Sequence, residues 1–479
     1  MLALKVVSVM LLVLCIQHVE RSRAKEVVVS EEESITHLSN LDFESLCCTS
    51  GQCTCQSFLR ALINLTDNVT INITTDVKLS SIVFVVGVNN ARVVGYNNPT
   101  VYCNNTGGAK FVSCRNITIE GIRWEGCGFY NTTNSDPVLG MYNSSGITIQ
   151  SCTFQNSIGQ AVVLLNVLGN VIVNSCVFIN NKQFRGHGTA VYYSGDTQVL
   201  FMIDNCSFID NGRAQSVVYI KGYRSSDAIS LLNSMFVRNH GVAVYIFYQV
   251  VYIRGNLLFE SNDNGGIFST NNSYVLFAKN SHARFCNNKA DLGGAIYSNN
   301  NSNILFEENS TVTFTENNAK KYGGAIHSGE NSDTSFEGNS TVIFIKNSAI
   351  FNGGAIYSHD NSNILFAENA TVTFSENSAR YGGAMHSLSN SKISFKDSST
   401  ATFTENNSKW DGGAINVRDN SKISFDGNSM VEPYTPMTTP TSYLTPNLRY
   451  PLPRITPHGK VELYIPLTVP ISHLKRCLQ

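Results

Sequence analysis

Short alternations of apolar and polar residues recur through the middle and C-terminal parts of the chain. Residues 293–317 read "GGAIYSNNNSNILFEENSTVTFTEN" and carry three of them, "GAIYS", "SNILFEE" and "TVTFTEN", separated by Asn, Ser and Gly. An alternation of period two between turn-forming residues is typical of β-strands. The pattern therefore predicts three short strands in one unit of about 30 residues.

This unit repeats along the chain. Pairs of glycines begin at Gly293, Gly323, Gly353, Gly382 and Gly412, in steps of 30, 30, 29 and 30 residues. A phrase FxxN accompanies them at Phe314/Asn317, Phe344/Asn347, Phe374/Asn377 and Phe403/Asn406, and a second phenylalanine column stands at Phe306, Phe336, Phe366, Phe395 and Phe425. Three strands per repeat predict an all-β solenoid whose coils bury their side chains against the neighbouring coils.

Weaker copies of the pattern precede the clear repeats. Large apolar anchors stand at Trp124, Phe154, Phe178, Phe208, Phe236, Phe259 and Phe285. With the four FxxN phenylalanines they predict about eleven coils. Cysteine stands two residues before the anchor at Cys152, Cys176 and Cys206. This column is interpreted either as packed thiols or as one disulfide between neighbouring coils.

The glycine and asparagine columns have a structural interpretation. Glycine permits a positive φ and a close approach of the backbone at a corner, and asparagine tolerates the same region and can bond to an asparagine one coil away. We expect these roles for the first glycines given above, for Asn317, Asn347, Asn377 and Asn406, and for the second glycines Gly294, Gly324, Gly354, Gly383 and Gly413.

The combination of GGA[ILV] with FxxN resembles the repeats of the chlamydial polymorphic outer membrane proteins. More broadly, residues 124–428 resemble the pectin-lyase-like right-handed parallel β-helix superfamily. The resemblance implies a right-handed parallel β-helix with three-strand coils. It implies no single function, because this solenoid hosts unrelated activities.

The ends of the chain differ from the repeats. Residues 1–24 carry a short apolar run after Lys5 and are interpreted as a secretion signal. Residues 25–110 are expected to form an N-terminal cap and the first strands, with a short helix within residues 55–68 over the open end of the β-helix. The repeat domain is expected to span residues 111–430. Residues 431–479 are rich in Pro and Thr and are expected to be a disordered tail.

Composition supports an exported protein. Charged residues make up 14% of the chain and the net charge is −1, so we expect neither nucleic acid nor an anionic membrane as partner, and no segment is long enough for an apolar membrane span. Asn-x-Ser/Thr sequons recur from Asn64 to Asn406 and predict a secreted glycoprotein. The cluster "CCTSGQCTC" at residues 47–55 favours disulfide bonds over a zinc site, with the pairing left open.

Catalytic chemistry has one candidate motif. Gly186-His187-Gly188 resembles the Gly-His-Gly of polygalacturonases, which also need paired aspartates. The preceding coil reads "SIGQAVVL" without an acidic residue, and no carboxylate cluster for calcium with a basic partner stands on stacked positions. The sequence therefore predicts no enzymatic activity, no cofactor and no metal site.

One column of aromatic and imidazole side chains is the candidate binding site. Alignment of the "GAIYS" strand places Tyr192, Tyr219, Tyr245, Phe268, Tyr297, His327, Tyr357 and His386 one above another. Alternation directs them outward, where they would stack on sugar rings or a partner protein. The competing interpretation, which we favour, is that they hold the parallel coils together.

These observations predict a secreted, non-enzymatic β-helix repeat protein that presents an elongated surface for adhesion or recognition. Extracellular glycans or proteins are the candidate partners. The first alternative is a polysaccharide-active enzyme of the pectate lyase or polygalacturonase type on the same fold. The second is a purely structural extracellular rod.

Overall fold

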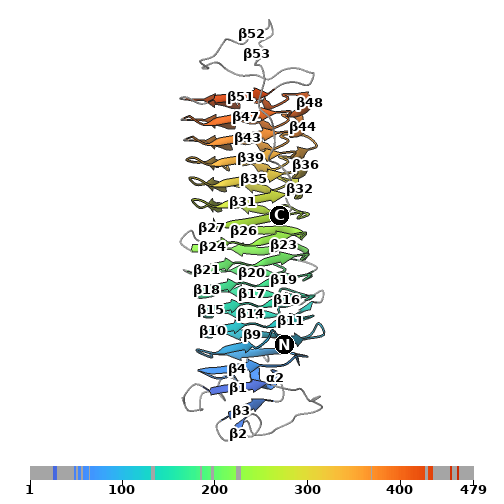
Figure 1. The fold of residues 1–479 in the computed structure, drawn as a ribbon, viewed down its shortest axis with the longest axis vertical. Helices are drawn as coiled ribbons and strands as arrows, with labels where there is room; N and C mark the ends of the chain where they lie inside the picture. Colours follow the sequence, from blue (N-terminus) through green and yellow to red (C-terminus); the bar gives the residue numbers. More distant parts are fainter. Residues whose placement is uncertain are drawn as a thin grey trace, which may run out of the picture. The chain divides into compact units, whose positions relative to one another are not determined.

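A computed structural model gives the fold (Figure 1) and describes residues 25–29, 48–49, 52–55, 58–63, 65–130, 135–183, 186–195, 199–222, 228–367, 369–396, 398–426, 430–434, 454–455 and 461–462. The chain divides into two compact units, residues 1–177 and residues 178–479. In each unit, strands one coil apart in the sequence pair in parallel, which confirms the predicted parallel β-helix. The predicted signal segment, Cys47 and most of the tail lie outside the described residues.

The first unit contains three parallel sheets. One sheet is formed by β1 (Lys25–Val29), β4 (Val69–Ile73), β7 (Arg92–Gly95), β10 (Arg115–Glu120), β15 (Ser145–Gln150) and β18 (Leu168–Asn174). The second is formed by β5 (Val77–Lys78), β8 (Thr100–Tyr102), β11 (Arg123–Glu125) and β16 (Thr153–Gln155). The third is formed by β6 (Ile82–Val86), β9 (Gly108–Val112), β14 (Leu139–Tyr142) and β17 (Val162–Leu165).

Short elements complete this unit. β2 (Cys48–Thr49) and β3 (Gln52–Cys55) form an antiparallel hairpin, as do β12 (Phe129–Tyr130) and β13 (Ser135–Asp136). The predicted helix is present as α2 (Phe58–Ile63), in which Leu62 is buried and Ile63 is 52% exposed. Parallel coils are already formed by β4 and β7, within the segment that the sequence assigned to the cap and first strands.

The second unit repeats the three sheets. The anchor sheet comprises β22 (Ser207–Ile209), β25 (Met235–Val237), β28 (Asn256–Glu260), β31 (His282–Cys286), β35 (Thr311–Thr315), β39 (Thr341–Ile345), β43 (Thr371–Ser375), β47 (Thr400–Thr404) and β51 (Met430–Tyr434). The column sheet comprises β20 (Val191–Ser194), β23 (Gly212–Lys221), β26 (His240–Phe247), β29 (Ile267–Thr270), β33 (Ile296–Asn299), β37 (Ile326–Ser328), β41 (Ile356–Ser358), β45 (Met385–Ser387) and β49 (Ile415–Val417). The third sheet comprises β21 (Val199–Asp204), β24 (Ala228–Leu232), β27 (Val250–Arg254), β30 (Tyr274–Phe277), β34 (Asn303–Phe306), β38 (Thr334–Phe336), β42 (Asn363–Phe366), β46 (Lys392–Phe395) and β50 (Lys422–Phe425). β19 (Val177–Ile179) stands at the division between the units, and the C-terminal segment adds the antiparallel pair β52 (Arg454–Ile455) and β53 (Val461–Glu462).

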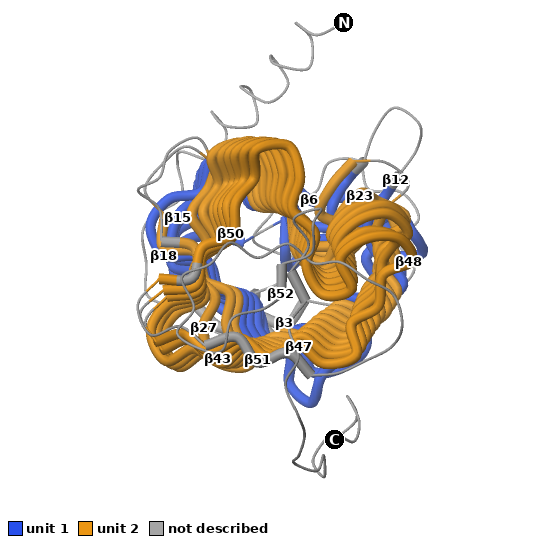
Figure 2. Tube along the Cα trace, turned by 90° about the horizontal axis from the view of Figure 1, so that it is seen from above, with its two compact units in different colours: residues 1–177 blue, residues 178–479 orange. Residues whose placement is uncertain are grey.

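A fourth strand per coil forms a small sheet that the sequence did not predict. The lobe sheet comprises β32 (Lys289–Leu292), β36 (Asn318–Tyr322), β40 (Ser348–Ala349), β44 (Ser378–Tyr381) and β48 (Asn407–Asp411). Figure 2 shows β48 on a different side of the coil from β47 and β50. In β32, β36 and β40 the buried residue is a small alanine such as Ala319, and β44 and β48 have no buried residue, so the period-two signal is weak.

Phenylalanine stacks fill the interior of the second unit. The Phe314 and Phe344 rings stack with centroids 4.7 Å apart, and Phe306 and Phe336 do so at 4.6 Å. The two stacks meet edge to face between Phe306 and Phe314, at 6.5 Å and 86°. Burial of each ring stabilises the fold by roughly 2–3 kcal/mol. All eleven predicted anchors are buried in such positions, which confirms the predicted coils.

An asparagine ladder closes the corner after each anchor strand. Asn317 is fully buried, and its Nδ2 donates at 3.0 Å to Oδ1 of Asn347 and at 2.9 Å to the carbonyl of Phe285. Asn347 bonds to Asn377, and Asn377 to Asn406, in the same way. The expected asparagine ladder is therefore present, and it satisfies buried amides that would otherwise have no partner.

The two glycines of each pair have different physical roles. Gly323 has a φ of +64°, a region that favours glycine. Gly324 has no positive φ, but a Cβ there would lie 2.0 Å from the carbonyl oxygen of Gly354 on the next coil. The first glycine thus allows the corner, and the second allows the backbones of successive coils to approach.

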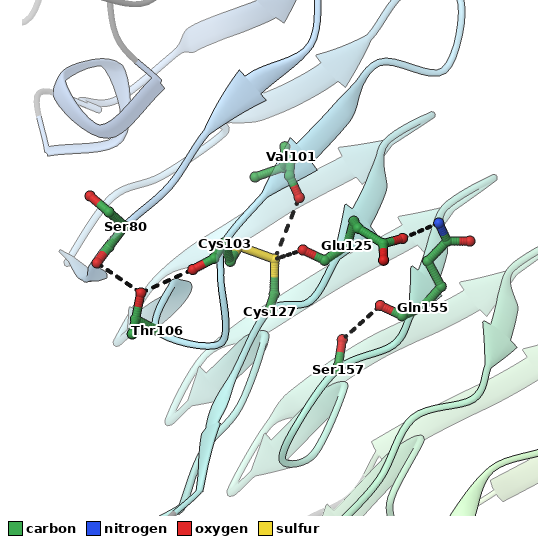
Figure 3. The surroundings of a disulfide bond; sticks show 8 residues. All are labelled: Ser80, Val101, Cys103, Thr106, Glu125, Cys127, Gln155 and Ser157. Carbon is green, nitrogen blue, oxygen red and sulfur yellow. Dashed lines mark hydrogen bonds between the residues drawn. A yellow bond between two sulfur atoms is a disulfide. The ribbon is translucent and has the colours of Figure 1, made fainter. Parts of the chain in front are cut away.

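One disulfide is present among the described residues, between Cys103 and Cys127 in the first unit. Figure 3 shows Cys127 Sγ between the carbonyl oxygens of Val101 and Glu125, each 3.5 Å away. The sequence did not propose this pair.

In the predicted cysteine column, Cys152 is a buried thiol and the Cys176 thiol donates to the Asn174 carbonyl at 3.2 Å, in accordance with the packed-thiol interpretation.

No helix in the part of the chain that the structure describes is long and apolar enough to cross a membrane.

Candidate functional site

The predicted column of the second unit is in register on the column sheet. Cα partners join each member to the next, in the order Tyr192, Tyr219, Tyr245, Phe268, Tyr297, His327, Tyr357 and His386. We call these residues the outer column. Centroids of neighbouring rings lie 4.5–5.6 Å apart. Asn416 continues the column beyond His386, a position that the sequence alignment did not include.

The first part of the outer column is partly accessible. Tyr192, Tyr245, Phe268 and Tyr297 are half-buried. Tyr219 is only 7% exposed, because the ring of His187 stacks on it with centroids 4.4 Å apart.

His187 therefore covers Tyr219 within the outer column. Its Nδ1 lies 3.4 Å from Ser216 Oγ, its ring meets Tyr245 edge to face at 4.9 Å, and burial lowers its pKa. The contacts of His187 thus give the Gly-His-Gly motif a packing role.

The second part of the outer column is covered, and the expectation of an exposed row is wrong there. His327 is 2% exposed, Tyr357 5% and His386 2%. The lobe sheet causes this burial, since the Tyr322 ring stacks on Tyr357 with centroids 4.9 Å apart. Alternation does direct these side chains away from the interior, but a strand that the sequence did not predict lies over them.

Ring geometry also limits what the accessible part can bind. Tyr192 stacks on Tyr219 at an interplanar angle of 25°, and Tyr245 stacks on Phe268 at 14°. Rings that stack on one another along the column present mainly their edges to solvent. The geometry therefore favours the interpretation that the outer column holds the coils together.

Burial disfavours the charged forms of the side chains in the outer column. It raises the pKa of Tyr297 to about 12 and likewise that of Tyr357 to about 12. Burial, and then the charge of Arg418, lower the pKa of His386 to about 4. Neutral phenol and imidazole groups suit a packed interface better than an ionic one.

The lobe sheet and the residues beside it combine cations with one exposed aromatic ring, Trp410, and two half-buried ones, Phe351 and Tyr381. We call Lys320, Lys321, Phe351, Arg380, Tyr381, Lys409, Trp410 and Arg418 the lobe face. The Arg380 guanidinium lies 4.5 Å from the Trp410 ring centroid and 5.2 Å from that of Phe351. Trp410 is 51% exposed.

Only part of this positive charge is neutralised. Lys320 pairs with Asp291 at 3.0 Å, and Arg418 pairs with Asp411. No carboxylate in the described ranges pairs with Lys321, Arg380 or Lys409. The lobe face therefore carries a local positive charge, although the whole chain has a net charge of −1.

A second polar feature is an open groove of about 520 Å³ in the second unit, lined by Asn180, Lys182, Asp210, Gly212, Arg213 and His240. Its acidic groups are paired with basic ones. Arg238 binds Asp210 through two contacts of 2.9 Å, and His240 Nδ1 lies 2.7 Å from Asp263. The groove is lined by no Phe, Tyr or Trp ring, so the lobe face, which combines cations with aromatic rings, is the stronger candidate for a sugar ligand.

The comparisons support the resemblance stated from the sequence. The family model of the Chlamydia polymorphic membrane protein repeat matches residues 283–299 and 303–329. These residues contain the Gly293 pair and the first clear FxxN phrase, so the resemblance of the repeats is confirmed. No curated protein matches the chain.

Solved structures similar to the chain include two proteins in complex with a bound saccharide. The catalytic domain of a GH87 alpha-1,3-glucanase in complex with nigerose is 11% identical, with a TM-score of 0.43, over 83% of this chain and 71% of that chain. The tailspike protein of E. coli bacteriophage HK620 in complex with a pentasaccharide is 13% identical, with a TM-score of 0.25, over 75% of this chain and 69% of that chain.

The glucanase match contradicts the expectation that the chain has no enzymatic activity, because a catalytic domain is among the similar chains. That expectation is withdrawn. The similarity itself assigns no reaction to this chain.

Proposed function

We propose that the chain recognises an extended, negatively charged glycan on the lobe face. The observation that carries the proposal is the alternation of cations and aromatic rings on successive coils, with the Arg380 guanidinium between the Phe351 and Trp410 rings. Cations pair with the carboxylate or sulfate groups of an acidic sugar, while an exposed aromatic ring packs against the apolar face of a sugar.

A polymeric glycan suits the lobe face because the sugar units of the glycan and the coils of the protein both recur at a regular spacing. The main-chain N of Phe351 donates to the Lys321 carbonyl at 2.9 Å, and that of Arg380 donates to the Phe351 carbonyl at 3.0 Å, so these residues stand on successive coils. Several weak contacts at regular spacing then add up along one ligand chain. The predicted export of the protein, which stays a prediction, would bring the lobe face to extracellular glycans.

The test is direct binding of the purified chain to polyuronate, sulfated and neutral glycans of matched length. We expect binding to the acidic glycans, weakened as salt rises from about 0.05 to 0.5 M, because exposed ion pairs are screened. The double variant Lys321→Gln/Arg380→Gln should bind about fivefold to tenfold more weakly, because each exposed ion pair with the glycan contributes about 1 kcal/mol or less to the binding free energy.

Arg284→Gln is the matched control, because Arg284 is an exposed cation on the anchor sheet. It should bind as the unaltered chain does. Equal loss in both variants would mean that overall charge, and not the lobe face, attracts the glycan. Equal affinity of the unaltered chain and both variants, for acidic and neutral glycans alike, would contradict the proposal.

A further inference from the structure

Two imidazole rings meet between successive coils of the second unit. His327 lies in β37, and His359 follows β41 on the next coil. Their Nε2 atoms are 2.9 Å apart, and the ring planes are nearly perpendicular, at 88°. His327 is buried, whereas the side chain of His359 is 20% exposed, so the pair can be reached from solvent at one side.

Gly329 provides the space for this contact. A Cβ at position 329 would lie 2.5 Å from His359 Nε2 and 3.0 Å from Asn299 Oδ1. Asn299 ends β33 one coil earlier, so its amide oxygen faces the same small space as the imidazole nitrogen. The His359 nitrogen and the Asn299 oxygen, which come from different coils, therefore lie beside a residue without a side chain.

The hydrogen bonds of His359 orient one lone pair toward His327. His359 Nδ1 lies 2.8 Å from Asp360 Oδ2, and a proton on Nδ1 donates to that carboxylate. In the neutral ring that carries this proton, Nε2 holds the lone pair, and Nε2 is the atom that lies against His327 Nε2. A carboxylate behind an imidazole is a common arrangement for fixing the tautomer of a metal-binding histidine.

We infer that His327 Nε2 and His359 Nε2 bind a divalent transition-metal ion, with the Asn299 amide oxygen or water at further positions. Metal–nitrogen bonds of about 2.0–2.1 Å that meet at a right angle place the nitrogens about 2.9 Å apart, whereas a tetrahedral angle places them about 3.3 Å apart. The observed separation thus favours the square-planar or octahedral preference of copper(II) or nickel(II) over tetrahedral zinc.

The site differs from what the sequence suggested. The sequence predicts no metal site, and the histidine nearest to His327 in the predicted column is His386, two coils away. The partner of His327 is instead His359, which stands two residues beyond the outer column and one coil away. The described residues hold no group of three or more His, Cys, Asp or Glu side chains suited to a metal, so the site offers two imidazoles and open positions.

The experiment is titration of the chelator-treated full chain with copper(II) and, separately, nickel(II), followed by calorimetry and, for copper, by electron paramagnetic resonance. We expect about one ion per chain and nitrogen hyperfine structure from two imidazoles. His359→Gln should weaken binding at least tenfold.

Gly329→Ala is the second test variant, because it keeps both histidines while its Cβ displaces the His359 ring. It should also weaken binding at least tenfold. His282→Gln is the control, because His282 is exposed on the anchor sheet, and it should leave the binding unchanged. Circular dichroism without metal must show that all three variants remain folded.

Two results would overturn the inference. Absence of binding at about one equivalent would show that the two rings form only a hydrogen bond. Binding unchanged in both His359→Gln and Gly329→Ala would place the ion elsewhere on the chain.

Discussion

Asn347 Oδ1 accepts two hydrogen bonds from Asn317, one from its main-chain N and one from its side-chain Nδ2, each at 3.0 Å. A single buried amide thus joins two coils through both the backbone and a side chain. The same arrangement continues from Asn377 to Asn406.

Asn347→Ala should therefore destabilise the β-helix strongly. The substitution leaves buried donors on Asn317 without an acceptor, at roughly 1–3 kcal/mol for each unsatisfied group. We expect a loss of about 3 kcal/mol or more, measured as a lower urea midpoint by circular dichroism. Asn318→Ala, at an exposed lobe position whose Nδ2 bonds to Ser348 Oγ, should lose less than about 1 kcal/mol. Equal losses in the two variants would contradict a special role for the ladder.

The glycine pair gives a prediction that depends on position. Gly324→Ala brings a Cβ within 2.0 Å of the Gly354 carbonyl oxygen, so two coils must separate. We expect a loss of more than about 3 kcal/mol or failure to fold. Gly413→Ala occupies the equivalent place in a later coil, where the nearest atom, the Asn406 carbonyl oxygen, is 3.7 Å away. Its thermal midpoint should change little, and a large fall would show that the clash is not the cause.

Stability should fall with acidity because of His386. Burial and Arg418 lower the folded-state pKa of His386 to about 4, whereas the unfolded chain has an ordinary value of about 6.5. The unfolded state therefore binds more protons between these values, and the free energy of unfolding decreases as the pH falls from about 6.5 to 4, by up to roughly 3 kcal/mol.

The measurement is urea unfolding at several pH values, for the unaltered chain and for His386→Phe. The variant should lose this part of the pH dependence. His282→Gln should keep it, because His282 is exposed. A pH dependence that is the same in all three proteins would exclude His386 as its source.

The disulfide between Cys103 and Cys127 should stabilise the first unit. It closes a loop with a sequence separation of 24 residues, which corresponds to roughly 3 kcal/mol in the chain-entropy description. Cys103→Ser/Cys127→Ser should lower the thermal midpoint. A reductant should lower the midpoint of the unaltered chain but not that of the double variant, and a fall in both would point to another disulfide.

The repeat pattern was enough to predict the coil. Period-two alternation, the buried anchors from Trp124 to Phe403 and the columns of Asn317 and Gly323 recur at one spacing, and all of them act between adjacent coils. Each repeat of about 30 residues returns the chain to the same position, so residues one repeat apart lie side by side on successive coils. The parallel fold and the asparagine ladder therefore follow from the pattern.

Two features become visible only in the folded structure. One is the strand that covers the coil, and the other is the set of side chains that meet although they are not at equivalent positions of the repeat. The lobe strand from Asn318 to Tyr322 has no apolar alternation, so the burial of Tyr357 beneath Tyr322 has no signature in the sequence. The cations of the lobe face are spread between Lys320 and Arg418 and form no basic run. His327 and His359 meet because Gly329 leaves space between them, and such a contact depends on side-chain packing across coils, which spacing along the chain does not encode.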